Sequence, residues 1–109
     1  MPKIYTKKGD LGTTQLRNHQ ILDKNDLRIE ALGTIDELNS AIGMVRSHAV
    51  TTTLSENILQ RIQHELSNAG SELGNPGSII IEDVYVCRLE QEIDDLNTLL
   101  PPLNTFILP

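Results

Sequence analysis

Apolar positions recur every three or four residues in three successive segments of the 109-residue chain. This spacing places them on one face of a helix. The first segment follows Asp26, a favoured N-cap residue, and the third stops at Pro101 and Pro102, which cannot continue a helix. The apolar positions are, in chain order, Leu32, Ile35, Leu38, Ile42, Val45 and Ala49; then Ile58, Ile62, Leu66, Ala69 and Leu73; then Val86, Leu89, Ile93, Leu96 and Leu100. The pattern predicts three helices within residues 26–100.

Short polar breaks separate these segments. Thr53 and Glu56 have the spacing of a capping box at the start of the second helix. Residues 74–77 (GNPG) form a strong stop, and residues 78–81 read as a short apolar connector. The acids at 82–83 suit the positive end of the third helix dipole. We therefore predict an all-α fold, an up-and-down bundle of antiparallel helices in one domain spanning residues 1–109.

The first predicted helix has features that point to several neighbours. Gly33 and Gly43 each cost about 1 kcal/mol relative to Ala inside a helix, so we expect another element to approach closely there. Ala31, Ala41 and Met44 lie off the main apolar stripe. Burying one large aliphatic side chain is worth roughly 1.5–3 kcal/mol, so we expect further helices, a partner chain, or both to cover this helix.

The segment before the helices differs in composition and charge. Residues 1–25 lack apolar periodicity, and we expect a loop or short extended structure. Residues 1–28 carry a net charge of +3 and residues 29–109 a net charge of −9, within an overall −6. Residues 5–14 supply glycine backbone amides, threonine hydroxyls and lysine ammonium groups. Because phosphate binding uses these three kinds of donor, the segment indicates an anionic ligand at the N-terminal end.

Composition argues against several other classes of protein. The acidic balance disfavours nonspecific nucleic-acid binding, and no apolar run approaches the length of a membrane span or a signal-peptide core. A cytoplasmic protein is the expectation. His19, His48 and His64 share no metal-ligand spacing, so we predict no protein metal site. Cys87 cannot form an internal disulfide and is interpreted as a small core residue.

Five motifs follow one another in the order and spacing of a known family. They are residues 4–14 (IYTKKGDLGTT), 28–43 (RIEALGTIDELNSAIG), 62–66 (IQHEL), 70–73 (GSEL) and 100–109 (LPPLNTFILP). Together they resemble the ATP:cob(I)alamin adenosyltransferases of the propanediol-utilisation (PduO) type. The resemblance covers almost the whole chain, and agreement among separate motifs makes it specific.

The resemblance implies a larger fold and assembly. Members of this family are five-helix bundles that assemble as homotrimers, with ATP and the corrin bound between adjacent subunits. By this resemblance, residues 1–25 form the nucleotide-binding loop and residues 26–100 form three of the five helices. Residues 101–109 form the turn that leads to the two remaining helices. We accordingly expect a chain truncated before those two helices.

Site residues are carried over by position from the same resemblance. The ATP-binding residues are Tyr5, Thr6, Lys7, Lys8, Gly9, Asp10, Gly12, Thr13, Thr14, Gln15 and Lys24. Asp36 matches an acid that pairs with an arginine of the adjacent subunit, and Phe106 matches an aromatic placed against the lower face of the corrin. The plain alternatives are that residues 9–12 form an ordinary turn, that Asp36 is a solvated surface acid, and that Phe106 is a hydrophobic tail anchor.

The implied activity is transfer of the 5′-deoxyadenosyl group of ATP to cobalamin in its cob(I)alamin form, with release of triphosphate. Co(I) is itself a strong nucleophile, so the protein mainly orients the reactants and neutralises phosphate charge, helped by Mg²⁺. Two alternatives stay open. One is a truncated, non-catalytic ATP-binding or assembly fragment of the same family. The other is a three-helix interaction module without a ligand.

Overall fold

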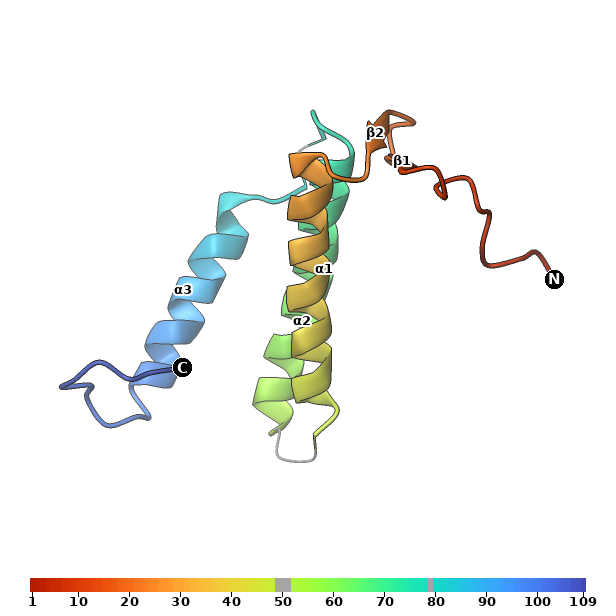
Figure 1. The fold of residues 1–109 in the computed structure, drawn as a ribbon. Helices are drawn as coiled ribbons and strands as arrows, with labels where there is room; N and C mark the ends of the chain where they lie inside the picture. The colour runs from red at the N-terminus through yellow and green to blue at the C-terminus, as the bar shows by residue number, and fades with distance from the viewer. Residues whose placement is uncertain (49–51, 79) are drawn as a thin grey trace.

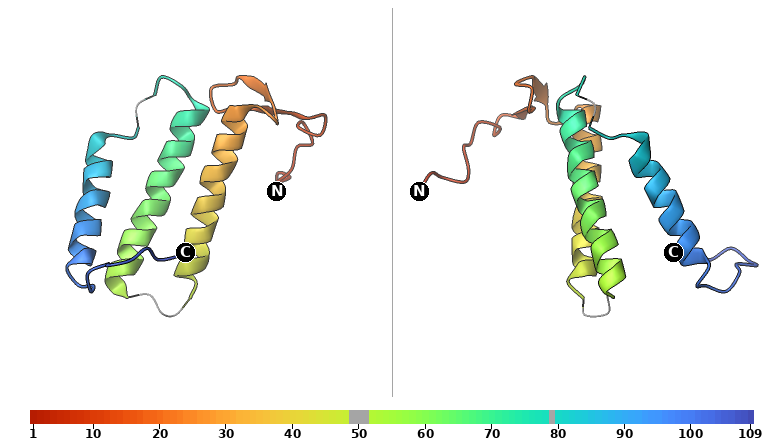
Figure 2. Two further views of the ribbon diagram at one scale, coloured as in Figure 1. Left: turned by 60° about the vertical axis from the view of Figure 1, so that its left-hand side comes forward. Right: turned by 180° about the vertical axis from the view of Figure 1, so that it is seen from behind.

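Three helices and one small sheet make up the chain. The computed structural model describes residues 1–48, 52–78 and 80–109. The elements are β1 (Thr13–Gln15), β2 (Ile21–Asp23), α1 (Leu27–Arg46), α2 (Thr53–Gly74) and α3 (Asp83–Asn97). The helices alternate in direction; α1 and α2 lie side by side, and α3 stands at an angle beside them (Figures 1 and 2). The prediction of three helices is confirmed, although the expected positions Ala49, Thr51 and Ile79 lie outside the described residues.

The β-hairpin fits the expected loop or short extended structure of residues 1–25, but it adds a small sheet to the predicted all-α fold. β1 and β2 pair antiparallel, with Thr14 opposite Leu22. The amide of Leu16 donates to the carbonyl oxygen of Gln20 (2.8 Å), and His19 has a φ of 67° in the connecting turn. The all-α prediction is therefore wrong for this segment. The strands are three residues each, too short for a period-two pattern to appear in the sequence.

The helix starts are set by side-chain caps. The Asp26 carboxylate accepts a hydrogen bond from the amide of Arg28 (2.8 Å), which confirms the predicted N-cap of α1. The capping box of α2 lies one residue earlier than predicted: Thr52 and Ser55 each accept from the other's backbone amide. The prediction of Thr53 with Glu56 is wrong because the Ser55 hydroxyl already takes the N3 role.

The helix ends follow the sequence signals closely. α2 ends at Gly74, as the GNPG stop predicts. α3 ends at Asn97, three residues before the predicted boundary at Leu100. The amides of Leu99 and Leu100 donate to carbonyl oxygens three residues earlier, at Leu96 and Asn97. The turn after Asn97 is therefore tighter than an α-helical turn, and the two prolines that follow it prevent a further helical turn.

Polar side chains join α1 to α2 midway along their length. The Gln63 amide donates to the carbonyl oxygen of Asn39 (2.9 Å), and the Asn39 amide donates to the carbonyl oxygen of Gln63 (3.2 Å). A Cβ built on Gly43 would lie 3.2 Å from Gln63 Nε2, so Gly43 is a point of close approach, as predicted. A Cβ on Gly33 would meet nothing within 4 Å, so the same prediction is wrong for Gly33 within this chain.

Ion pairs connect α3 to α2. Arg61 binds both carboxylate oxygens of Glu92, and Arg88 Nη1 lies 3.4 Å from Glu65 Oε1. The connector adds a further link, because the amide of Ile81 donates to a Glu72 carboxylate oxygen (2.9 Å). Charged contacts that are partly exposed contribute modestly, so α3 is held less firmly than α1 and α2 hold each other.

Much of the apolar surface is uncovered. The chain exposes 9,050 Å², whereas a compact monomer of this mass exposes about 6,000 Å². Among the described residues, Leu16 is the buried hydrophobic side chain, at 7% exposure. The predicted apolar stripe is half-buried along α2, but on α3 it is largely exposed at Val86, Ile93 and Leu96.

The exposed stripe also corrects the interpretation of the cysteine. Cys87 is exposed, so its prediction as a core residue is wrong: nothing in the described chain covers that face of α3. Met44 of α1 is exposed as well, in line with the expectation that α1 needs additional neighbours. Of the helices that the structure describes, none is long and apolar enough to cross a bilayer.

The two glycines of α1 give a matched test of the α1–α2 contact. Gly33→Ala is expected to raise the free energy of unfolding by about 0.5–1 kcal/mol, because it gains helix propensity in open space. Gly43→Ala is expected to gain less, since its new methyl group must displace the Gln63 amide from Asn39. Urea unfolding followed by circular dichroism measures both; equal gains would contradict the close approach at Gly43.

The ion pair between α2 and α3 predicts a pH-dependent contribution to stability. Hydrogen bonding to Arg61 holds the pKa of Glu92 below its ordinary value of 4.5. Glu92→Gln is expected to cost about 0.5–1 kcal/mol at pH 7. Because the native pKa is lowered, this contribution is present above the unfolded-state value and lost as the pH falls through the native value. Chemical unfolding measured from pH 7 down through the native pKa of Glu92 should show the cost of Glu92→Gln disappear.

Glu90→Gln is the control for this experiment, because Glu90 is exposed on the same helix. It removes one negative charge without touching Arg61, so it should leave the free energy of unfolding nearly unchanged. A cost for Glu92→Gln that stays constant from pH 7 to acid would show that the ion pair does not cause it.

Candidate functional site

Gly9 is a point of close backbone approach in the N-terminal segment. A Cβ on Gly9 would lie 2.9 Å from the carbonyl oxygen of Thr13 and 3.2 Å from Cε and Nζ of Lys24. Such a contact with a backbone oxygen is too short for any side chain, so the position requires glycine. The amide of Lys24 donates to the carbonyl oxygen of Gly12 (2.9 Å) and closes the loop. Lys24 is thereby brought to a turn fifteen positions earlier in the sequence.

Two successive turns shape the loop. The amide of Asp10 donates to the carbonyl oxygen of Lys7, and the amide of Gly12 donates to that of Gly9, both at 3.2 Å. Lys7 has a φ of 61° and Gly12 a φ of 95°. The left-handed conformation is easy for glycine but uncommon for lysine, so the loop holds Lys7 in a sparsely populated conformation.

A pocket of about 440 Å³ opens between this loop and the hairpin. Its lining consists of Thr6, Lys8, Gly9, Thr13, Thr14, Gln15 and Ile21. Six of these seven residues are among the predicted ATP contacts, and they supply hydroxyl, ammonium, amide and backbone groups. This donor set suits the oxygens of a phosphate chain.

The remaining predicted ATP residues lie around the pocket. Lys24 adjoins it at Gly9, while Asp10 and Gly12 form the turn and are exposed. The ammonium groups of Lys3 and Lys7 lie over the ring of Tyr5, 5.7 and 5.8 Å from its centre. The structure therefore places six of the predicted ATP residues in the lining and leaves the other five outside it, namely Tyr5, Lys7, Asp10, Gly12 and Lys24.

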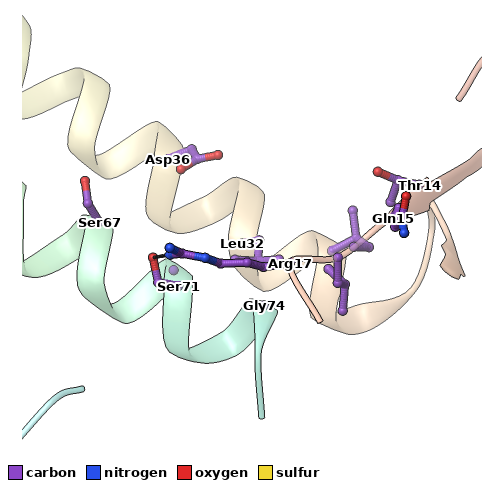
Figure 3. Close-up of a pocket in the computed structure, with 11 residues that line it drawn as sticks. Thr14, Gln15, Arg17, Leu32, Asp36, Ser67, Ser71 and Gly74 are labelled. Atoms are coloured by element: carbon purple, nitrogen blue, oxygen red, sulfur yellow. Dashed lines mark hydrogen bonds between the residues drawn. The ribbon is translucent and has the colours of Figure 1, made fainter. Parts of the chain in front are cut away.

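A second pocket of about 470 Å³ lies where the hairpin meets α1 and α2 (Figure 3). It is lined by Thr14, Gln15, Leu16, Arg17, Ile29, Leu32, Asp36, Ser67, Gly70, Ser71 and Gly74. Arg17 Nη1 donates to Ser71 Oγ of α2 (3.1 Å). Thr14 and Gln15 line both pockets, so the surface is continuous from the loop to Asp36. Within the described parts of the chain, the carboxylate of Asp36 has no ion-pair partner.

Phe106 is not brought to this site. Its side chain is 86% exposed. The C-terminal segment that follows α3 lies at the end of the helices opposite the hairpin (Figures 1 and 2). Leu103 and Ile107, near Phe106 in the chain, line a separate apolar pocket with Leu100. The placement of Phe106 against a corrin therefore stays a prediction.

Two contributors were missed from the sequence. Arg17 reaches from the hairpin to α2, and Leu16 anchors the hairpin by burial. A single apolar residue within a polar run, TTQLRN, was the available signal for Leu16. No sequence signal indicated the partner of Arg17, since Ser71 lies 54 positions away. Across residues 1–48, 52–78 and 80–109, no group of three His, Cys, Asp or Glu side chains is arranged to hold a metal ion.

Comparison with known proteins identifies the family of this chain. The family model described as cobalamin adenosyltransferase matches residues 4–109. A cobalamin adenosyltransferase of Cupriavidus metallidurans is 39% identical over 109 residues, covering 100% of this chain and 59% of the relative. A corrinoid adenosyltransferase of Mycobacterium leprae is 37% identical over 119 residues, covering 100% of this chain and 62% of the relative.

A solved structure shares the fold. It is a variant PduO-type ATP:corrinoid adenosyltransferase from Lactobacillus reuteri, complexed with cobalamin and ATP, with a TM-score of 0.86 and 35% identity. The match covers 98% of this chain and 61% of that one. The chain thus spans about three fifths of the length of these relatives. With a family match over nearly its whole length, the chain belongs to the cobalamin adenosyltransferase family.

Proposed function

We propose that the protein acts as an ATP:corrinoid adenosyltransferase, moving the 5′-deoxyadenosyl group of ATP onto cob(I)alamin. The single observation that carries this proposal is the close approach of Lys24 to Gly9, beside a pocket lined by groups that suit phosphate oxygens. We call this arrangement the phosphate cradle. It lies in a chain whose relatives are named corrinoid or cobalamin adenosyltransferases. A neighbouring solved structure is complexed with both ATP and cobalamin.

The proposed reaction needs positioning and charge stabilisation from the protein. Co(I) attacks C5′ of the ribose, a Co–C bond forms, the C5′–O bond breaks, and its electron pair leaves with triphosphate. Lys8 and Lys24 supply ammonium groups, and Thr6 supplies a hydroxyl, to the oxygens that gain this charge. Thr13, Thr14 and Gln15 provide further polar contacts in the same pocket.

Mg²⁺ is proposed to enter bound to the triphosphate. A divalent ion that bridges phosphate oxygens neutralises charge without requiring a dedicated set of protein ligands. The lining of the pocket suits this arrangement, because it offers hydroxyl and amide groups beside the ammonium of Lys8.

A homotrimer is proposed as the working assembly. Asp36 lies on an open groove, which leaves its carboxylate accessible to an arginine of an adjacent subunit. The exposed apolar face of α3 supports contacts with further helices or chains. Phe106 is proposed to face the corrin in such an assembly. We place the activity in the cytoplasm, a reducing compartment in which the exposed Cys87 stays a thiol.

A second candidate is an ATP-binding fragment that does not catalyse transfer. The observation that favours it is the separation of the C-terminal segment, which carries the exposed Phe106, from the N-terminal segment within one copy of the chain. A chain that holds the triphosphate but does not bring an aromatic to the corrin would bind ATP without forming adenosylcobalamin.

Gly9→Ala tests the phosphate cradle directly. The added methyl group would overlap the carbonyl oxygen of Thr13 and displace the end of Lys24, so it is expected to weaken MgATP binding about ten-fold or more. Calorimetric titration of the chain measures the affinity. Gly33→Ala is the matched control, because it makes the same chemical change in open space and should bind as the parent does.

The same proteins separate the two candidates in an anaerobic assay with reduced cobalamin and ATP. Formation of adenosylcobalamin and triphosphate supports the transferase, and the Cupriavidus metallidurans relative serves as the positive control. MgATP binding without product supports the fragment. If Gly9→Ala binds MgATP as tightly as the parent, both candidates lose the phosphate site that they share.

A further inference from the structure

The ring of Tyr5 gathers two cations of the nucleotide loop. Nζ of Lys3 lies 5.7 Å from the ring centre, and Nζ of Lys7 lies 5.8 Å from it. Both distances fall within the range of cation–π attraction. The ring is 57% exposed, so it is not held there by a hydrophobic core. Two ammonium groups are therefore among the neighbours of this largely exposed ring.

Lys7 has a further unusual feature that needs explanation. Its backbone φ of 61° is rare for a residue with a side chain, and its carbonyl oxygen accepts from the amide of Asp10. Thr6 and Lys8 on either side line the phosphate pocket, but Lys7 does not. A strained backbone persists where the surroundings enforce it, often next to a binding site. In this conformation the ammonium of Lys7 lies over the ring of Tyr5 instead of lining the pocket.

We propose that Tyr5 is a positioning residue, which holds the ammonium groups of Lys3 and Lys7 beside the phosphate pocket. The inference rests on the proposed function and adds Lys3 to its cations. A lysine side chain loses much rotamer freedom when it is immobilised, and the ring imposes part of that loss before the ligand arrives. The ring face meets one side of each ammonium, which leaves other N–H donors for phosphate oxygens.

The grouping of lysine ammonium groups around Tyr5 favours binding of an anion with several negative charges. Lys3, Lys7, Lys8 and Lys24 are all the lysines of the chain, and all lie in its first 24 residues. Two ammonium groups on one ring repel each other, and the ring's negative face offsets part of that repulsion. An arriving polyphosphate offsets the rest. Tyr5 should therefore affect the binding of the phosphate chain itself, independently of the adenine base.

Inorganic tripolyphosphate is the probe that isolates this effect, since it has no base or ribose to stack on Tyr5. In calorimetric titrations of the full chain, Tyr5→Leu is expected to weaken tripolyphosphate binding about two- to five-fold. Tyr5→Phe keeps the ring face and should restore the parent affinity. Tyr85→Leu is the matched control, because Tyr85 lies on α3 with Arg88, not a loop lysine, near its ring.

A spectroscopic readout tests the geometry without any ligand. The ε-methylene protons of Lys3 and Lys7 should show upfield ring-current shifts in the parent and in Tyr5→Phe. These shifts should be absent in Tyr5→Leu, while those of Lys8 stay unchanged. Equal lysine spectra in the parent and Tyr5→Leu would overturn the proposal even if tripolyphosphate binding fell.

Lys24→Ala distinguishes failure of this inference from failure of the proposed function. If Lys24→Ala weakens tripolyphosphate binding and Tyr5→Leu does not, the phosphate site stands and the positioning role of Tyr5 is overturned. If Tyr5→Leu weakens ATP binding but not tripolyphosphate binding, Tyr5 contacts the base and the inference is again overturned. If neither variant changes the binding of either ligand, the proposed function and the inference fall together.

Discussion

The arrangement of the candidate site depends on the burial of one side chain, Leu16. It directly follows β1 and lines the groove with Ile29 and Leu32 of α1 and with Gly70 and Gly74 of α2. Two strands of three residues would not hold their position in water alone. Because Leu16 is withdrawn from solvent against the helix pair, the hairpin is fixed on the helices, and the N-terminal loop before it acquires a defined place.

The helical body was predictable because its signals are local. Asp26 caps α1 through a contact two residues away, the stripe of α2 follows helical spacing, and the GNPG stop ends that helix at Gly74. These features need no information about distant residues. The predicted position of the capping box was wrong by one residue, since the box is formed by Thr52 and Ser55. Two adjacent threonines are equally good N-cap residues, and the backbone conformation decides which of them caps the helix.

The features that the sequence did not predict depend on contacts between residues far apart in the chain. Gly9 reads as an ordinary turn residue until Lys24 and Thr13 are seen to approach it. The interpretation of Cys87 as core fails because the stripe beside it on α3 lacks a covering element among the described residues. The residues of the ATP loop were identified from the resemblance, and periodicity alone would have left them an unassigned polar segment.

The central claim is that the loop closed by the Lys24–Gly12 hydrogen bond, with the end of the Lys24 side chain beside Gly9, is where a nucleoside triphosphate binds. Mapping backbone amide chemical shifts of the isotope-labelled chain during MgATP titration tests it most directly. The account predicts that the largest changes fall in residues 6–15 and at Lys24, with small ones along α3. Shifts concentrated on α3, or an unchanged spectrum at millimolar MgATP, would contradict it.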